Sequence, residues 1–284
     1  MSGTEKNLYR RLLLDLHETM ADERTLRIAA ELARLLRLDL QALFVEDPAL
    51  LALGRLPHTR ELRLPGHGWE NLDAERIAAE IEQAAVRARR LLEEASAATG
   101  VSCVFEIRRG DPATVMAACC EPTDIVVVAE PRRASERVTG SFARRRQAAY
   151  RSASAVLLIP PGKTRAHGKV VAVAPAMPDA SVATAARIAL HADENLLLVV
   201  PAGAAAAAID AAHAAGLARA RIATRKLAGR TQAAIAHTLT GLDARLLVIT
   251  RGSITSDGAP DEETALSRLA DTCGILVLAV ESQA

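Results

Sequence analysis

The most constraining feature of this sequence is a regular alternation between short apolar runs and longer segments rich in alanine, leucine and charge. The run RLLLDL at 11–16 predicts a short buried strand, and residues 22–36 follow it with a helical period. Four apolar residues of this helix share one face, and charged residues occupy the rest. They are Leu26, Ala29, Ala30 and Ala33. A strand followed by an amphipathic helix is the unit of an α/β fold.

The same alternation continues to the end of the chain and occurs in two similar halves. The strands expected at 101–109, 124–130 and 155–161 are continuous apolar runs, and strands that are apolar on both faces belong inside a parallel sheet covered by helices. Aligning the halves pairs Gly110 with Gly229. The sequence therefore predicts a tandem repeat of one α/β design. Further strands are expected at 40–47, 101–109, 124–130, 155–161, 169–174, 195–200, 220–227, 245–250 and 275–280, and second-half helices at 179–192, 204–216, 231–241 and 261–274.

The length of 284 residues suggests two domains. Residues 160–169 carry prolines, glycines and charges between two apolar strands, which is typical of a linker. We therefore place one domain at 1–161, a linker at 162–169 and a second, shorter domain at 170–284.

The first half is longer because residues 46–100 contain an extra segment. Its second part, 73–97, has the period of a long amphipathic helix, whereas its first part mixes apolar and basic residues with prolines and glycines. We interpret that first part as a cover or interface loop. The expected apolar stripe of the helix is Ile77, Ile81, Ala84, Ala88 and Leu91.

The helix after Gly110 has the clearest boundaries in the chain. Asp111 is placed to cap its start, Pro112 fits its first position, and Pro122 marks its end.

Composition excludes several classes of protein. The formal charge is +1, and the basic runs lack interleaved aromatic residues, so neither nucleic acid nor a membrane surface is an expected partner. No apolar run reaches the length of a signal peptide core or a membrane span, which predicts a cytoplasmic protein. The four cysteines, at 103, 119, 120 and 273, have no metal-site spacing and are expected to be buried, reduced thiols.

Two such α/β units, with the turn RRGDPA at 108–113 followed by an apolar strand, resemble the universal stress protein family. This resemblance implies five parallel strands in the order 3-2-1-4-5 in each unit, helices on both faces, and pairing of two units through their fifth strands. The two halves are then expected to pair with each other, or a homodimer forms.

Family members that bind ATP carry G-x-x-G-x(9)-G-[S/T] after the fourth strand. Counted without gaps, this motif falls on Ala129, Arg132, Phe142 and Ala143, so none of its glycines is present. Gly140 and Ser141 lie two residues early. The resemblance therefore implies that standard ATP binding is lost.

In the same register, the family's nucleoside-binding aspartate falls on His17 and, in the second half, on Pro175. Only Val45 matches a position whose backbone contacts adenine. His17 is either a ligand contact or a strand-end histidine paired with a carboxylate such as Asp15 or Glu18.

Two interpretations of the segment after residue 130 remain open. Arg132 and Arg133, with the helix start at Gly140 and Ser141, could hold a nucleotide or another anion beside the strand ends. Alternatively, the arginines of this segment form a solvated or subunit-contact face. In the second half, Thr250 and Ser253 replace motif glycines, and an acidic helix start follows, which satisfies its own dipole and repels phosphate.

No other motif points to chemistry. GKT at 162–164 lacks the preceding glycine of a P-loop, and the histidines do not have the spacing of a helical zinc site. We predict no catalytic residue, no metal ligand and no cofactor, apart from a possible ATP, AMP or phosphate-like anion in the first domain. The leading hypothesis is a non-enzymatic stress-type protein that acts through protein partners or self-association, and the alternative is a small-anion binding module. A slow nucleotide hydrolase is a weaker third option, because neither a general base nor a metal carboxylate pair is evident.

Overall fold

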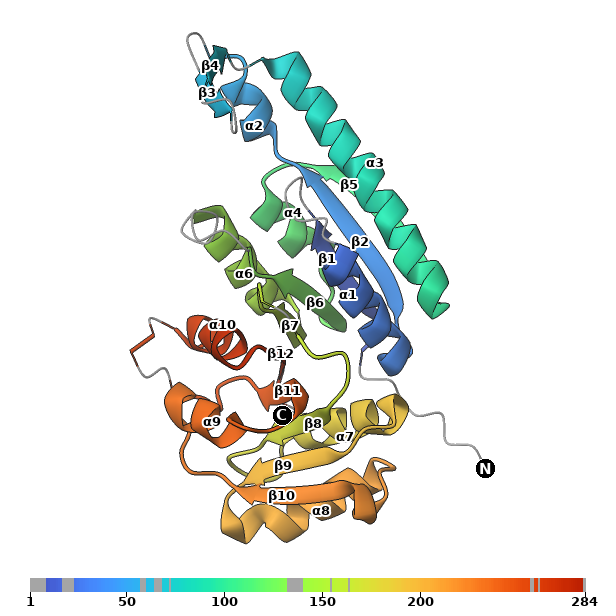
Figure 1. Cartoon of the computed structure of the whole chain (residues 1–284), viewed down its shortest axis with the longest axis vertical. Helices are drawn as coiled ribbons and strands as arrows, with labels where there is room; N and C mark the ends of the chain where they lie inside the picture. Colours follow the sequence, from blue (N-terminus) through green and yellow to red (C-terminus); the bar gives the residue numbers. More distant parts are fainter. Residues whose placement is uncertain are drawn as a thin grey trace.

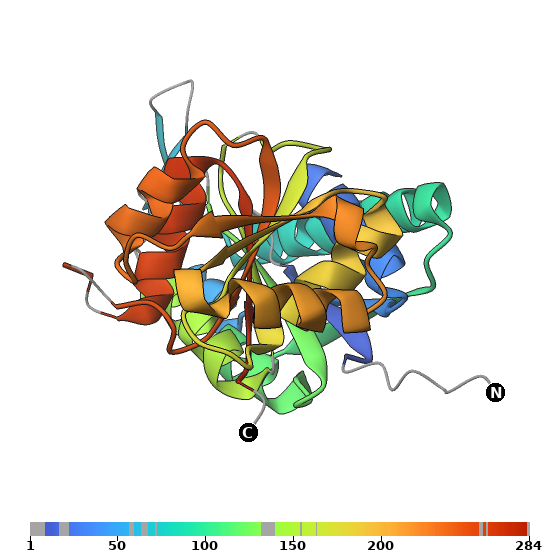
Figure 2. The same ribbon diagram turned by 90° about the horizontal axis from the view of Figure 1, so that it is seen from below.

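The computed structural model describes residues 9–16, 23–56, 60–63, 68–71, 73–131, 140–153, 155–162, 164–255, 258–259 and 261–282, without the side chains of 61–63, 140 and 141. One ten-stranded sheet runs through both halves of the molecule, with helices on both sides (Figures 1 and 2). The first half contains β1 (Arg11–Leu16), α1 (Glu23–Leu36), β2 (Asp39–Glu46), α2 (Pro48–Leu53), β3 (Arg60–Arg63), β4 (Gly68–Asn71), α3 (Ala74–Thr99), β5 (Cys103–Arg109), α4 (Pro112–Cys119), β6 (Asp124–Ala129), α6 (Gly140–Ser152) and β7 (Ala155–Ile159).

The second half repeats the design with shorter connections. It contains β8 (Lys169–Val173), α7 (Ala180–Ala192), β9 (Leu196–Val200), α8 (Ala205–Ala214), β10 (Ile222–Lys226), α9 (Gln232–Leu239), β11 (Ala244–Thr250), α10 (Glu262–Cys273) and β12 (Leu276–Val280), with 3-10 turns η1 (Ala202–Ala204) and η2 (Arg219–Arg221).

The order of strands in the sheet is β10-β9-β8-β11-β12-β7-β6-β1-β2-β5. Read from each half's own first strand, this is 3-2-1-4-5 twice. All neighbours are parallel except β7 and β12, the fifth strands, which pair antiparallel. The predicted fold class and strand order are confirmed, and the two halves form one sheet through their fifth strands.

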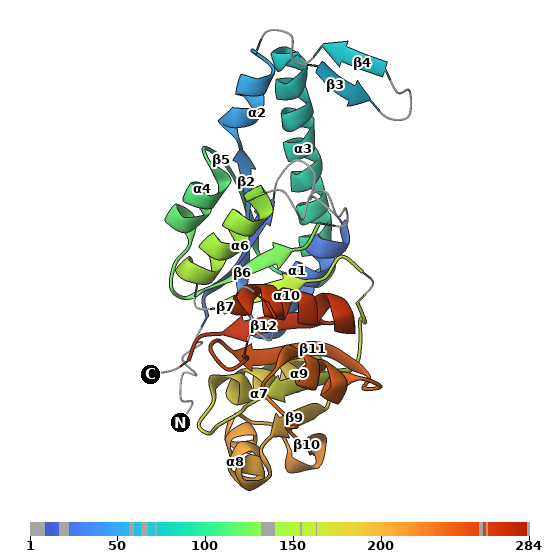
Figure 3. The same ribbon diagram turned by 90° about the vertical axis from the view of Figure 1, so that its left-hand side faces the viewer.

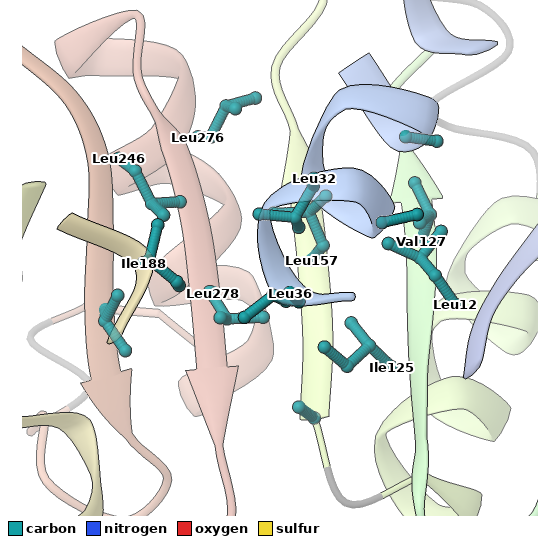
Figure 4. Packing of buried hydrophobic residues seen from close by; sticks show 14 of the residues in the cluster. Leu12, Leu32, Leu36, Ile125, Val127, Leu157, Ile188, Leu246, Leu276 and Leu278 are labelled. Carbon is teal, nitrogen blue, oxygen red and sulfur yellow. The ribbon is translucent and has the colours of Figure 1, made fainter. Parts of the chain in front are cut away.

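Apolar side chains pack on both faces of this sheet. The cluster on one face joins strand residues to α1, α3, α7 and α8, and the cluster on the other joins them to α4, α6, α9 and α10. On the first face, Leu32 and Leu36 of α1 lie beside Leu157 of β7 and Leu278 of β12, so the apolar layer continues from one half into the other (Figure 4).

Polar contacts also join the halves. Arg245 Nη2 donates to Glu31 Oε1 at 3.0 Å, and both side chains are largely shielded from solvent. On the opposite face Ser267 Oγ donates to Glu130 Oε1, and both of these residues are buried. These ties, together with β7 and β12, hold the halves in a fixed relation.

Local sequence signals explain several helix boundaries. Asp111 caps α4 by accepting a hydrogen bond from Thr114 N at 3.0 Å, and α4 begins at Pro112, as predicted. Hydrogen bonds from the backbone N–H and the hydroxyl of Thr114 lower the pKa of the Asp111 carboxyl. A Cβ at Gly110 would lie 2.9 Å from the side chain of Val115, and one at Gly229 would lie 3.2 Å from Ala234. Gly110 and Gly229, which the alignment of the two halves paired, thus each approach the side chain of the residue five positions later.

The structure corrects the prediction for the inserted segment. Its first part is not a plain loop, because it contains the short helix α2 and the antiparallel hairpin β3–β4. These elements project beyond the sheet at the start of α3 (Figures 1 and 3). The stripe of α3 is also centred slightly differently, because Ile77, Ala84 and Leu91 are only half-buried. The buried residues of α3 are Ile81, Ala85, Ala88, Leu92 and Ser96.

Two further expectations are corrected. The strand β5 is not buried on both faces, because the 3-2-1-4-5 order places it at the edge of the sheet, with Val104 57% exposed. The four cysteines are free thiols, as predicted, but each is half-buried instead of fully buried.

The division into two domains with a linker stays a prediction, and residues 160–168 lie between β7 and β8. Within the described ranges, no helix is both long and apolar enough to cross a bilayer.

Candidate functional site

The carboxyl ends of β1, β2 and β6 meet at one edge of the first half, because these strands are parallel neighbours. Ligands of open α/β sheets bind at such edges. Of the predicted site residues, Val45 lies at the end of β2, where its side chain is 1% exposed and packs in the cluster that contains Met116. Its burial is explained by the core alone. His17, Arg132 and Arg133 lie outside the described residues.

Gly140 and Ser141 are the first two residues of α6. The helix start therefore lies where the sequence placed it. The first turn of α6 contains no acidic residue. The first turn of a helix has backbone N–H groups without intrahelical partners and the positive end of the helix dipole, and no carboxylate of this turn neutralises them.

The arginine triplet of α6 does not converge on one pocket. Arg144 Nη1 lies 3.7 Å from Asp111 Oδ1, beside α4. Arg146 Nη2 donates to Thr264 Oγ1 of α10 at 2.9 Å, and its guanidinium stacks over the Phe142 ring. Arg145 turns to the sheet instead. The triplet joins α6 to three neighbouring elements.

Arg145 and Asp15 form a buried ion pair beneath the carboxyl ends of β1 and β6. Arg145 Nη1 lies 3.7 Å from Asp15 Oδ2, and both side chains are about nine-tenths buried. Burial raises the pKa of the Asp15 carboxyl, and the nearby guanidinium opposes that rise. Asp15 was one predicted partner for His17, and its charged neighbour in the described structure is Arg145.

At the equivalent edge of the second half, a carboxylate of the chain binds the loop that follows β11. Glu262, in the first turn of α10, accepts the backbone N–H of Gly252 at 2.8 Å and that of Ile254 at 3.3 Å. Both donors belong to the loop that follows β11. Backbone N–H groups of such a loop are the groups that cradle a phosphate. A carboxylate of this chain occupies them.

Three further hydrogen bonds hold this loop and the end of the strand before it. Arg230 donates to Ser253 O at 2.9 Å and to Gly252 O at 3.1 Å. At the end of β11, Thr250 Oγ1 donates to Asp179 Oδ1, the cap of α7, at 2.5 Å. The loop is therefore held from three sides by side chains of its own half.

Solved structures with the same arrangement include three that cover nearly all of this chain. A universal stress protein from Archaeoglobus fulgidus DSM 4304 superposes with a TM-score of 0.64 at 12% identity, covering 97% of this chain and 98% of that one. A protein of unknown function from Pseudomonas aeruginosa PAO1 gives 0.54 at 16% identity, with 97% and 94% covered. A proposed universal stress protein from Pseudomonas aeruginosa UCBPP-PA14 gives 0.52 at 16% identity, with 97% and 95% covered.

The chain has the universal stress protein fold. No protein-family model and no curated protein matches it in sequence. The shared fold brings the end of the fourth strand and the helix after it to the same place in both halves, at β6 and α6 and at β11 and α10. In ATP-binding members of the universal stress protein family, this is where the resemblance places the phosphate loop.

The roles of Glu262 and Arg145 were not predicted from the sequence. The acidic start of α10 was recognised, and Asp261 does cap it by accepting from Thr264 N at 2.7 Å. Glu262 also binds the loop before its helix, and no local sequence pattern indicates how close its carboxylate lies to the Gly252 amide. The sequence did contain a signal for Arg145. Asp15 lies within the apolar run 11–16, and a buried carboxylate requires a partner.

A cavity of about 90 Å³ lies between the halves, beside α1 and residues 164–166. Its arginines make contacts within the chain: Arg24 donates to Thr164 Oγ1 at 3.1 Å, and Arg245 pairs with Glu31. Among the described residues, no group of histidine, cysteine and acidic side chains is arranged to hold a metal ion.

Proposed function

We propose that this chain is a non-enzymatic universal-stress-type protein that acts through protein contacts in a stress response and does not bind ATP in the standard way of that family. In the second half, the observation that carries the nucleotide part of this proposal is the occupation of the Gly252 and Ile254 amides by Glu262, and in the first half it is the loss of the motif glycines at Ala129 and Arg132. A triphosphate would have to displace a charged hydrogen-bond acceptor and then lie against its negative charge.

The surface offered to protein partners is the part of the insert that precedes α3. Leu53 is 45% exposed, Leu56 54% and Trp69 64%. They belong to α2, the turn after it and the hairpin strand β4, which project from the body of the molecule (Figure 3). Exposed aromatic and aliphatic residues on a projecting element are typical anchors of protein interfaces.

A melting experiment tests the nucleotide part of this proposal. Purified protein is denatured to look for released nucleotide, and its melting temperature is measured with and without millimolar ATP or AMP. We expect no released nucleotide and no shift. A ligand present at 100 times its Kd would add about 2.7 kcal/mol of stability, so a clear upward shift would contradict the proposal.

The contact part is tested with variants of the insert. Leu53→Ser, Leu56→Ser and Trp69→Ser are combined, and proteins captured from stressed cells are compared with those of the unchanged chain. We expect the captured proteins to be lost while the circular dichroism spectrum is retained. Leu190→Ser, an exposed leucine of α7 in the other half, is the matched control and should change nothing. Equal capture by both variants would refute a contact role for the insert.

A second candidate is supported by α6. Its first turn lacks an acid, unlike that of α10, so a nucleotide or another anion could bind at Gly140 and Ser141 with Arg132 and Arg133. Arg132→Ala with Arg133→Ala would then weaken binding of a phosphate-like anion such as AMP. Unchanged AMP binding in that variant would remove this candidate.

A further inference from the structure

The strand β5 forms one end of the ten-stranded sheet. Within the described part of the chain it pairs with β2 and with no other strand. An edge strand presents unpaired backbone N–H and C=O groups on its free side. Two apolar residues of this strand are also accessible, since Val104 is 57% and Ile107 43% exposed. The edge is therefore open to another strand.

Two of the three charged residues of β5, Glu106 and Arg108, form an ion pair on one face of the strand. Glu106 and Arg108 share one face because they are two residues apart in a strand. Glu106 Oε2 accepts a hydrogen bond from Gln41 Nε2 at 2.9 Å, and Arg108 Nη2 lies 2.5 Å from Glu106 Oε1. Gln41 in turn accepts from Arg11 Nη1 at 2.6 Å. This ladder reaches the edge with an acid and a base already ordered side by side.

A second copy of β5 fits this edge in one register. In a two-fold antiparallel pair, directly opposite residues point to the same face, so the axis passes through a residue and not between two residues. An axis at Glu106 would place two acids opposite each other, and an axis at Arg108 two bases. An axis at Ile107 places each Glu106 opposite Arg108 of the second copy. Only this register of the three gives opposite charges at both positions.

The same register also brings together an exposed apolar residue of each copy, Ile107, on the other face of the strand. Ile107 would meet Ile107 of the second copy at the axis. It lies on the face of Phe105, which packs on the α3 side, where the Arg89 guanidinium stacks over the Phe105 ring. Val86, one turn earlier on α3, is 65% exposed. Cross-strand aliphatic pairs and opposite charges both stabilise sheet pairing.

We propose that two copies of this chain associate antiparallel through β5, with the two-fold axis at Ile107, and so join their sheets into one. The other edge does not fit this role, because β10 (IATRK) contains basic residues and no acid, so no register there pairs opposite charges. This inference does not depend on the function proposed above, since β5 contains neither the insert anchors nor the loop after β11.

Sedimentation equilibrium on the full chain tests it. The unchanged protein should have twice the mass of one chain at micromolar concentration. Glu106→Arg and Arg108→Glu should each raise the dimer Kd at least tenfold by placing like charges opposite each other. The double variant, which exchanges the two charges, should return the Kd to within a few-fold of the original. Lys226→Glu on the β10 edge is the control and should leave the Kd unchanged.

Three outcomes would overturn the proposal: a monomeric chain at 100 µM, about a hundredfold above the micromolar range in which we expect the dimer; single variants that dimerise like the unchanged protein; or a folded double variant that fails to recover. If either single variant does not fold, Ile107→Lys replaces it. The amide exchange of β5 is then compared with that of β10, and dimer formation should protect β5 alone.

Discussion

The helices α6 and α10 occupy the same place in the two halves but begin in opposite ways. The start of α10 carries Asp261 as its cap and Glu262 and Glu263 in its first turn. The start of α6 carries Gly140 and Ser141 and no acid in its first turn. The two halves share one fold, yet acidic residues of its own first turn neutralise the positive end of α10, whereas the first turn of α6 contains no such carboxylate. The chemistry of the site is therefore set by a few residues and not by the fold.

The two helices also differ in how they are anchored. Glu262 reaches outward to the loop before its helix, whereas Arg145 of α6 reaches inward to Asp15 of the sheet. Removing the partner of a buried charge lowers the free energy of unfolding more than removing the partner of a half-exposed charge. The predictions below use this difference, from the largest expected effect to the smallest.

Removing Arg145 should have the largest effect. Arg145→Met leaves Asp15 buried without its ionic partner, which typically costs about 3–5 kcal/mol in the free energy of unfolding. Adding Asp15→Asn to this variant removes the stranded charge and should recover a large part of the loss. Urea unfolding of the three variants at pH 7 measures these energies. A loss of less than about 1 kcal/mol in Arg145→Met would contradict a buried pair.

The pH dependence of that variant follows from the pKa of Asp15. Burial raises this pKa in the folded state above its unfolded value near 4. A raised pKa gives a contribution to stability that is full below the unfolded pKa and is lost as pH rises through the folded pKa. Arg145→Met loses the guanidinium that opposes this rise, so the pKa of Asp15 lies higher still in the variant, and the variant should regain stability relative to the unchanged protein as pH falls from 7 towards 4. A constant difference over this range would argue against Asp15 as the cause.

Removing Glu262 should have a smaller effect. Glu262→Ala leaves the amides of Gly252 and Ile254 without their acceptor, and we expect a loss of about 1 kcal/mol because this carboxylate is partly exposed. Glu262→Gln keeps a neutral acceptor and should lose less. Amide hydrogen exchange should accelerate at residues 252–254 in the alanine variant. Unchanged exchange there would show that the carboxylate does not hold the loop.

Adding an acid to α6 should have the smallest effect. Ser141→Glu gives α6 the kind of start that α10 has, and the helix dipole should then stabilise the protein by about 0.3–1 kcal/mol at low salt. Ser152→Glu, at the other end of α6, is the matched control and should be destabilising. Thermal melts at low and high salt separate the two, since salt screens the effect. Equal shifts for both variants would exclude the dipole as the cause.

The sequence predicted the fold because its signals are local and repeated. Predicted apolar runs such as 124–130 and 155–161 form buried strands, and Leu26 and Ala33 lie on the buried face of their helix. Asp111 caps its helix, as predicted. The pairing of the fifth strands came from the family resemblance. The insert was predicted less well, because its short helix and hairpin have exposed residues and no clear period.

The site was harder to predict because it depends on distances in space. Ten residues separate Glu262 from Gly252, and Arg145 lies far along the chain from Asp15. A run of arginines suggests a common anion, whereas helix geometry sends Arg144, Arg145 and Arg146 to three different neighbours. The structure identifies the neighbour that each of the three contacts, which the sequence does not name.

The most direct measurement of whether Glu262 fills the loop after β11 is an ATP titration followed by the backbone amide signals of Gly252 and Ile254. If the carboxylate holds these amides, both signals remain unmoved up to millimolar ATP with magnesium. A saturable movement of both signals, at a concentration where the rest of α10 is unchanged, would contradict it.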